Sequence, residues 1–163
     1  MDVQTLAWIL LGIALVGLGI YRQFVRRAIE PARLLVVPLV LAAYGLVQLA
    51  KEHTSALSLA WLALDVALAV ALGVWRARTM RVWRASEGIA MAQGTTLTAI
   101  GWGTSVACRI ATAVAGAALG VPVGLGAMLL AVGATFGAQN AVVIARAKRL
   151  TPSPDGAARP HRA

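Results

Sequence analysis

The sequence has few charged residues, and acidic residues are the scarcest of them. Asp, Glu, Lys and Arg make up 13% of the 163 residues, and only six of these are acidic. An average soluble domain carries about 25% charged residues. Hydrophobic residues make up 60%, and the mean hydropathy is +0.78. This composition excludes a soluble globular enzyme and predicts a protein that crosses a bilayer several times.

Cysteine and histidine are also nearly missing. Cys108 is the one cysteine, so an intramolecular disulfide, a dithiol redox pair and a cysteine zinc site are excluded. The two histidines, His53 and His161, lie in a short loop and in the carboxyl-terminal tail, so neither can hold a haem inside the membrane. We therefore expect no metal and no cofactor.

Long apolar runs dominate what is present. A bilayer core of about 30 Å needs about 20 apolar residues in a helix. Five runs of about this length cover residues 3–21, 34–50, 57–75, 97–120 and 123–145. The predicted fold class is an all-α, polytopic membrane bundle of five transmembrane helices. Residues 76–96 form a basic loop in this prediction, and residues 146–163 form a disordered basic tail.

The basic residues indicate an orientation. With five spans, all but two of the 15 Lys and Arg fall on one side of the membrane. The exceptions are Lys51, on the other side, and Arg109, inside the fourth run. Because the Lys- and Arg-rich side of a membrane protein is cytoplasmic, we expect the amino terminus outside and the carboxyl terminus inside. The charge placement therefore predicts a multi-pass protein whose basic loops face the cytoplasm.

The net charge of +9 could also indicate nucleic-acid binding. The basic residues are clustered between apolar runs, however, which favours anionic lipid headgroups as the partner and no nucleic acid. Residues 82–92 read as two short segments around a turn at Ser86, Glu87 and Gly88, either a hairpin or an interfacial helix. The residues expected to contact headgroups are Arg76, Arg78, Arg81, Trp83 and Arg84.

Two charged residues lie near the middle of predicted spans. Asp65 lies in the third run and Arg109 in the fourth, at matching depths. Because an unpaired charge inside a membrane is costly, we expect the two to form an ion pair. The pair is either a polar core that fixes helix register or part of a site for a small polar or anionic substrate. The other candidate substrate-binding residues are Tyr44, Gln48, Ser105, Thr112, Gln139 and Asn140.

Small residues recur every four positions in the last two runs. Ala107, Ala111 and Ala115 line one side of the fourth, and Gly133, Gly137, Ala141 and Ala145 line one side of the fifth. Such stripes let helices approach closely. Because the linker between the two runs is only three residues long, 120–122, we expect them to form the best-packed pair of the bundle, although the same pattern is also typical of dimerisation.

Two segments resemble a known family. They are the run WRARTMRVWRASEGIAMAQGTTLT at residues 75–98 and the run PARLLVVPLVL at residues 31–41, which follows an Arg-rich loop. Their content and order resemble the CcdC-like family of small bacterial integral membrane proteins, over about residues 22–110. The family name implies a link to cytochrome c maturation and thiol transfer, but the family has no established activity. With one cysteine, this chain is limited to an accessory role in that chemistry.

The sequence therefore favours a non-enzymatic accessory or structural membrane component, with a membrane-protein partner or as a homo-oligomer. The alternative is a small transporter or permease for a small polar or anionic substrate, with its site around Arg109. A membrane-embedded enzyme comes third, because beyond Asp65 and Arg109 no clustered acid, base or metal set can be assembled.

Overall fold

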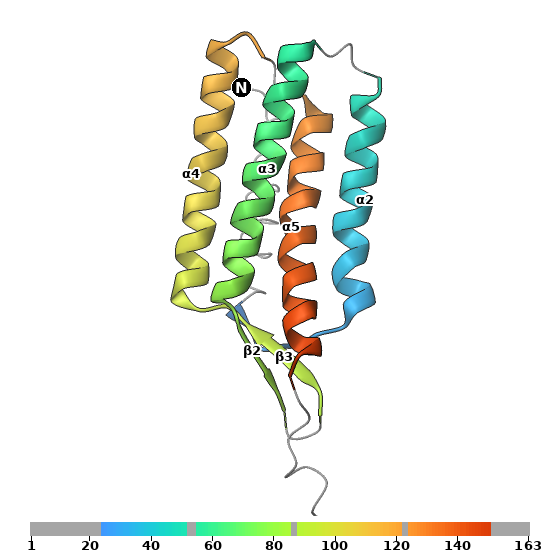
Figure 1. The fold of residues 1–163 in the computed structure, drawn as a ribbon, viewed down its shortest axis with the longest axis vertical. Helices are drawn as coiled ribbons and strands as arrows, with labels where there is room; N and C mark the ends of the chain where they lie inside the picture. The colour runs from blue at the N-terminus through green and yellow to red at the C-terminus, as the bar shows by residue number, and fades with distance from the viewer. Residues whose placement is uncertain (1–23, 52–54, 86–87, 122–123, 151–163) are drawn as a thin grey trace, which may run out of the picture.

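The computed structural model describes residues 24–51, 55–85, 88–121 and 124–150. Within them, four long helices run side by side, and a small antiparallel sheet lies at one end of the helices (Figure 1). We call this end the sheet end and the opposite one the far end. The helices are α2 (Pro31–Leu49), α3 (Ala56–Thr79), α4 (Thr96–Ala118) and α5 (Leu125–Lys148). The strands are β1 (Arg27–Ala28), β2 (Arg81–Arg84) and β3 (Ala90–Gln93).

The four helices confirm the prediction of a multi-pass membrane protein. Each is long and apolar enough to cross a membrane. They correspond to the predicted runs 34–50, 57–75, 97–120 and 123–145, with ends that differ by a few residues. The first predicted run, 3–21, lies outside the described residues, as does the tail from residue 151.

The prediction of an all-α fold was wrong at the sheet end. Of the two alternatives for residues 82–92, the structure has the hairpin: β2 and β3 pair antiparallel, with Trp83 opposite Met91. Gly88 takes the positive φ of 77° that its turn requires. β1 adds to the free side of β3, so the strand order is β1-β3-β2. A loop between helices was expected here, but alternating side chains over two four-residue segments can bury one face against the helix ends.

The sheet is attached to the helices by an apolar cluster, and beside it an arginine joins α5 to the end of α3. Ala77 and Met80 at the end of α3, Ala92 of β3 and Val143 of α5 pack into a buried core. Nη1 of Arg146, on α5, donates hydrogen bonds to the carbonyl oxygens of Ala77 at 2.6 Å and Met80 at 2.9 Å. These carbonyls lie where α3 ends, so a side chain from α5 satisfies backbone groups that the helix itself leaves unpaired.

Glycines bring α5 into close contact with α2 and α3. A methyl group added at Gly45 of α2 would lie 2.6 Å from the backbone nitrogen of Leu130, and one at Gly133 of α5 would lie 2.7 Å from that of Ala42. On α3, a methyl group at Gly73 would collide with the carbonyl oxygen of Thr135. Backbone approaches this close allow extensive van der Waals contact, which is what holds helices together in lipid.

The expectation that α4 and α5 form the best-packed pair was wrong. α5 packs mainly against α2 and α3, whereas α4 packs against α3. Ala107, Ala111 and Ala115 are exposed, and so are Ala141 and Ala145. The glycines that α4 does use are Gly116, which accommodates the Trp61 ring of α3, and Gly101, which accommodates the Arg76 side chain of α3. A short linker brings two helix ends together but does not determine which faces touch.

We predict that Gly45→Ala destabilises the bundle. The added methyl group has no space against the backbone of α5, so the helices must separate, at a cost of about 1–3 kcal/mol in free energy of unfolding. Chemical unfolding of the purified chain in mild detergent measures the effect. Gly103→Ala is the matched control, because nothing lies within 4 Å of a methyl group at this helical position. Equal effects of the two variants would contradict the close-approach argument.

Candidate functional site

Several polar side chains inside the bundle have a hydrogen-bond partner that accounts for their presence there. Pro38, inside α2, has no N–H, so the carbonyl of Leu34 one turn earlier loses its usual helical donor. Asn140 of α5 supplies the missing hydrogen bond: its Nδ2 donates to the Leu34 carbonyl oxygen at 2.7 Å. Nε2 of the fully buried Gln139 donates to the Met80 sulfur at 3.6 Å. Both amides therefore connect one element to another.

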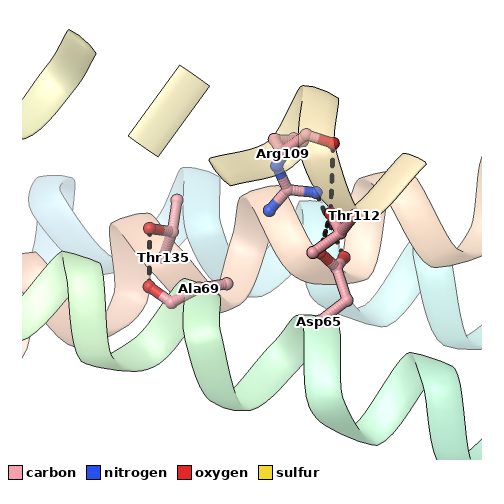
Figure 2. A network of polar contacts seen from close by, with 5 residues as sticks. All are labelled: Asp65, Ala69, Arg109, Thr112 and Thr135. Atoms are coloured by element: carbon pink, nitrogen blue, oxygen red, sulfur yellow. Dashed lines mark hydrogen bonds and ion pairs between the residues drawn. The ribbon is translucent and has the colours of Figure 1, made fainter. Parts of the chain in front are cut away.

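The predicted pair of Asp65 and Arg109 is present. Nη1 of Arg109 lies 3.3 Å from Oδ2 of Asp65, joining the middle of α4 to the middle of α3. Thr112 turns toward the same carboxylate, and its hydroxyl donates to Oδ1 at 3.3 Å and to the Arg109 carbonyl at 3.1 Å (Figure 2). The pair is partly exposed, with 33% of the Arg109 side chain and 19% of the Asp65 side chain accessible. It carries no net charge.

A cavity of about 610 Å³ lies between the four described helices. Because all four contribute to its wall, the row of helices α2, α5, α3 and α4 in Figure 1 must curve around it. Its polar lining consists of the Asp65 and Arg109 pair together with Arg76, Ser105 and Thr135. A cavity of this size, mostly apolar with a few polar groups, is typical of small-molecule sites.

Arg76 is the unusual member of this lining. Its side chain is fully buried, with 0% of its surface accessible, and no carboxylate of the described residues pairs with it. Nη2 donates to the Thr135 hydroxyl at 3.0 Å, and that hydroxyl donates to the Ala69 carbonyl at 2.8 Å (Figure 2 shows the second bond). Nε and Nη1 have no hydrogen-bond partner among the described residues.

Two neighbours on α4 hold the Arg76 side chain in place. Its aliphatic stem passes close to Gly101, where an added methyl group would lie 2.7 Å from Cγ of Arg76. The Trp102 ring covers the guanidinium, with its centroid 4.0 Å from Cζ. Trp102 in turn contacts Phe136 of α5, with ring centroids 5.5 Å apart. A cation stacked on an aromatic ring in a dry site gains about 2 kcal/mol, which offsets part of the cost of burial.

The other predicted site residues divide into three groups. Ser105 borders the cavity, and its hydroxyl donates to the Gly101 carbonyl at 2.7 Å. Thr112, Gln139 and Asn140 are involved in the contacts described above and do not border the cavity. Tyr44 and Gln48, also predicted to bind substrate, do not border the cavity: Tyr44 is 51% exposed, and Nε2 of Gln48 donates to its hydroxyl on the outside of α2.

The predicted headgroup contacts also need one correction. Arg76 was grouped with the basic loop, but it belongs to the last turn of α3 and extends into the bundle. Arg78 and Arg81 are exposed at the sheet end, and Trp83 is half-buried on β2. Arg84 donates to the carbonyls of Gly88 at 2.8 Å and Leu150 at 3.3 Å, so it holds the hairpin to the end of α5.

The sequence did contain a signal for Arg76. It follows Asp65 by 11 residues, which is about three helical turns, so both lie on the same face of α3. Ala69 and Leu72 fill the turns between them, and all four border the cavity. The predicted third run ended at residue 75, whereas α3 continues to Thr79. Arg76 was therefore assigned to the basic loop, and its position on the same helix face as Asp65 was missed.

No known protein family, no curated protein and no solved structure matches this chain. The residues that the structure describes also contain no group of three His, Cys, Asp or Glu side chains that could hold a metal ion. Any function must therefore be argued from the cavity and its side chains.

We predict that the cost of losing Asn140 depends on Pro38. Asn140→Leu leaves the Leu34 carbonyl without a donor inside the membrane, which lowers the free energy of unfolding by about 1–3 kcal/mol. In a Pro38→Ala background, residue 38 has an N–H that can donate to this carbonyl within the helix, so Asn140→Leu costs less. Unfolding measurements on the two single variants and the double variant test this, and equal costs in both backgrounds would contradict it.

We also predict energetic coupling between Asp65 and Arg109. Replacing either by Ala leaves the other charge unpaired near the middle of its helix, whereas the double replacement removes both charges. The double variant should therefore lose less stability than the sum of the single losses, with a coupling of about 1–3 kcal/mol. Unfolding of all four chains in one detergent gives this number. Strictly additive losses would show that the pair contributes nothing to stability.

Proposed function

We propose that the protein binds a small anionic molecule in the cavity between its helices and serves as a carrier for it. The observation that carries this proposal is Arg76, a fully buried guanidinium with no carboxylate partner among the described residues and two nitrogens without a hydrogen bond. Buried charges are otherwise paired, since an unpaired one costs several kcal/mol. An anion from outside the chain supplies the missing partner.

The arrangement of the two arginines supports the same proposal. Arg109 is neutralised by Asp65, so the positive charge of Arg76 is the net charge of the cavity lining. A buried structural arginine is expected to find hydrogen-bond acceptors within the protein. Nη1 of Arg146 reaches the carbonyl oxygens of Ala77, Arg78 and Met80 at the end of α3, whereas Nε and Nη1 of Arg76 reach none among the described residues. This contrast favours the carrier alternative over the accessory role that the sequence favoured.

The membrane setting belongs to the proposal as well. We place the sheet end in the cytoplasm of a bacterial cell, because exposed Arg78, Arg81 and Lys148 lie there and Lys51 lies at the far end. On this view the run 3–21 is a fifth membrane helix. Membership of the CcdC-like family stays a prediction from residues 31–41 and 75–98.

Anion binding is tested with the full chain in lipid nanodiscs, titrated with acetate, octanoate and inorganic phosphate. Trp102 covers the Arg76 guanidinium, so an anion that reaches the free nitrogens displaces the ring and changes its fluorescence. We expect at least one of these anions to bind, and Arg76→Gln to weaken that binding at least about tenfold, because a hydrogen bond to a charged group is worth about 1.5–3 kcal/mol. Arg78→Gln, an exposed arginine in the same helical turn, is the matched control and should bind like the original chain.

A stability measurement separates this role from a structural one. Arg76→Met removes a buried charge that has no carboxylate partner, so the ligand-free variant should be at least as stable as the original chain. A loss of several kcal/mol would assign Arg76 to the structure. The proposal fails if none of the three anions binds in a way that depends on Arg76.

A further inference from the structure

The wall of the cavity offers very few polar partners to a ligand. Apart from Arg76, its charged and hydroxyl side chains each have a partner on the protein: Nη1 of Arg109 pairs with Asp65, the Ser105 hydroxyl donates to the Gly101 carbonyl, and the Thr135 hydroxyl donates to the Ala69 carbonyl. Most of the remaining wall is aliphatic, with Val37 and Leu41 of α2, Leu68 and Leu72 of α3, and Val132 of α5. A ligand rich in hydroxyl groups would lose its hydrogen bonds to water here without replacement.

The charge of the lining favours a ligand with a single negative charge. Arg76 contributes one positive charge, and the Asp65–Arg109 pair contributes none. A dianion would leave one negative charge uncompensated in an apolar site, and a neutral molecule would leave Arg76 unpaired. One carboxylate, or one singly charged phosphate ester, matches the lining.

The cavity is also elongated along the helices. Asp65 and Arg76 border it 11 residues apart on α3, which corresponds to about 16 Å. On α4, Trp102 beside Arg76 and Cys108 beside the ion pair are six residues apart, or about 9 Å. The unpaired charge therefore lies at the sheet end of a long apolar space. This is the shape of a molecule with one polar head and one chain.

Part of the cavity wall faces the lipid. Val37 on α2, Val106 on α4 and Met128 on α5 border the cavity, yet they are 62%, 47% and 52% exposed on the described bundle. In a membrane protein such exposed aliphatic side chains contact lipid chains. The cavity is therefore accessible to a molecule that is itself dissolved in the bilayer.

From these observations we infer that the ligand is a single-chain amphiphile with one negative charge. Its head binds Nε and Nη1 of Arg76, and its chain extends along the aliphatic wall past Cys108 toward the Asp65–Arg109 pair. This inference rests on the proposed function and adds the chemical class of the ligand.

A chain-length series tests the inference. Acetate, butanoate, hexanoate and octanoate are titrated against the full chain in nanodiscs of zwitterionic lipid, with Trp fluorescence as the readout. Each buried methylene should tighten binding roughly fourfold, and hexanol, which lacks the charge, should bind at least tenfold more weakly than hexanoate. In Arg76→Gln the carboxylates should lose this advantage over the alcohol, whereas Arg78→Gln should retain it.

Cys108 gives an independent readout of where the chain lies. It is the one cysteine of the protein, and it borders the cavity about 9 Å along α4 from Trp102. Saturating octanoate should slow its reaction with a small neutral maleimide several-fold, and saturating acetate should leave the rate unchanged. In Arg76→Gln, octanoate should give no protection, which excludes a general effect of octanoate on the bilayer.

The outcomes separate this inference from the proposed function. If acetate binds as tightly as octanoate in an Arg76-dependent way and Cys108 is not protected, Arg76 still binds an anion, but the inference of a single-chain amphiphile is wrong. If no anion shows Arg76-dependent binding, both fail. Methyl octyl phosphate, a diester with one negative charge, in place of octanoate compares the two head groups, and either result keeps the single-chain class. If nanodiscs with phosphatidylglycerol abolish octanoate binding, the ligand is a two-chain lipid and the single-chain assignment is overturned.

Discussion

The close approach of α5 to α2 and α3 is the constraint on which the rest of the structure depends. Where Gly45 meets the backbone of Leu130, and Gly73 that of Thr135, there is no space for a side chain, so α5 occupies a fixed position between the two helices. α4 is then left with contacts to α3, and its Trp102 reaches Phe136 across a space that none of the four described helices fills. The cavity is a consequence of this unequal packing: tight contact on one side of α5 leaves an open space on the other.

Much of this architecture could be predicted from the sequence, because hydrophobic length and charge placement reflect the bilayer directly. The four described helices, the turn at Gly88 and the ion pair of Asp65 with Arg109 were all within reach of such reasoning. Helix pairing was not. A stripe of small residues shows that a helix can approach a neighbour closely, but it does not show which helix that neighbour is. Gly133, for example, packs against α2 rather than α4. The outward position of Tyr44 was missed for the same reason, since polarity alone does not reveal which face of a helix is covered.

The polar residues inside the bundle show why the position of Arg76 carries functional weight. Asn140 compensates for the proline in α2, Thr135 of α5 joins Arg76 to the Ala69 carbonyl of α3, and Thr112 supports the ion pair. Each has a partner that accounts for its presence in an apolar setting. Arg76 has one hydrogen bond and an aromatic ring for a group with five N–H donors. These polar neighbours have hydrogen-bond partners, whereas two nitrogens of Arg76 have none among the described residues. Arg76 is therefore where a ligand would complete the hydrogen bonding.

The contact between Arg146 and the end of α3 also affects the electrostatics of the cavity. The carbonyl groups at the carboxyl end of a helix carry about half a negative charge, and a cation in the last turn gains about 0.3–1 kcal/mol from it. Arg76 lies in that last turn, so the backbone dipole of α3 balances part of its charge. Arg146 donates to the same carbonyls and competes for that negative potential. Arg146 thereby leaves Arg76 more strongly positive than the helix alone would, which links the contact between α5 and the end of α3 to the electrostatic field in the cavity.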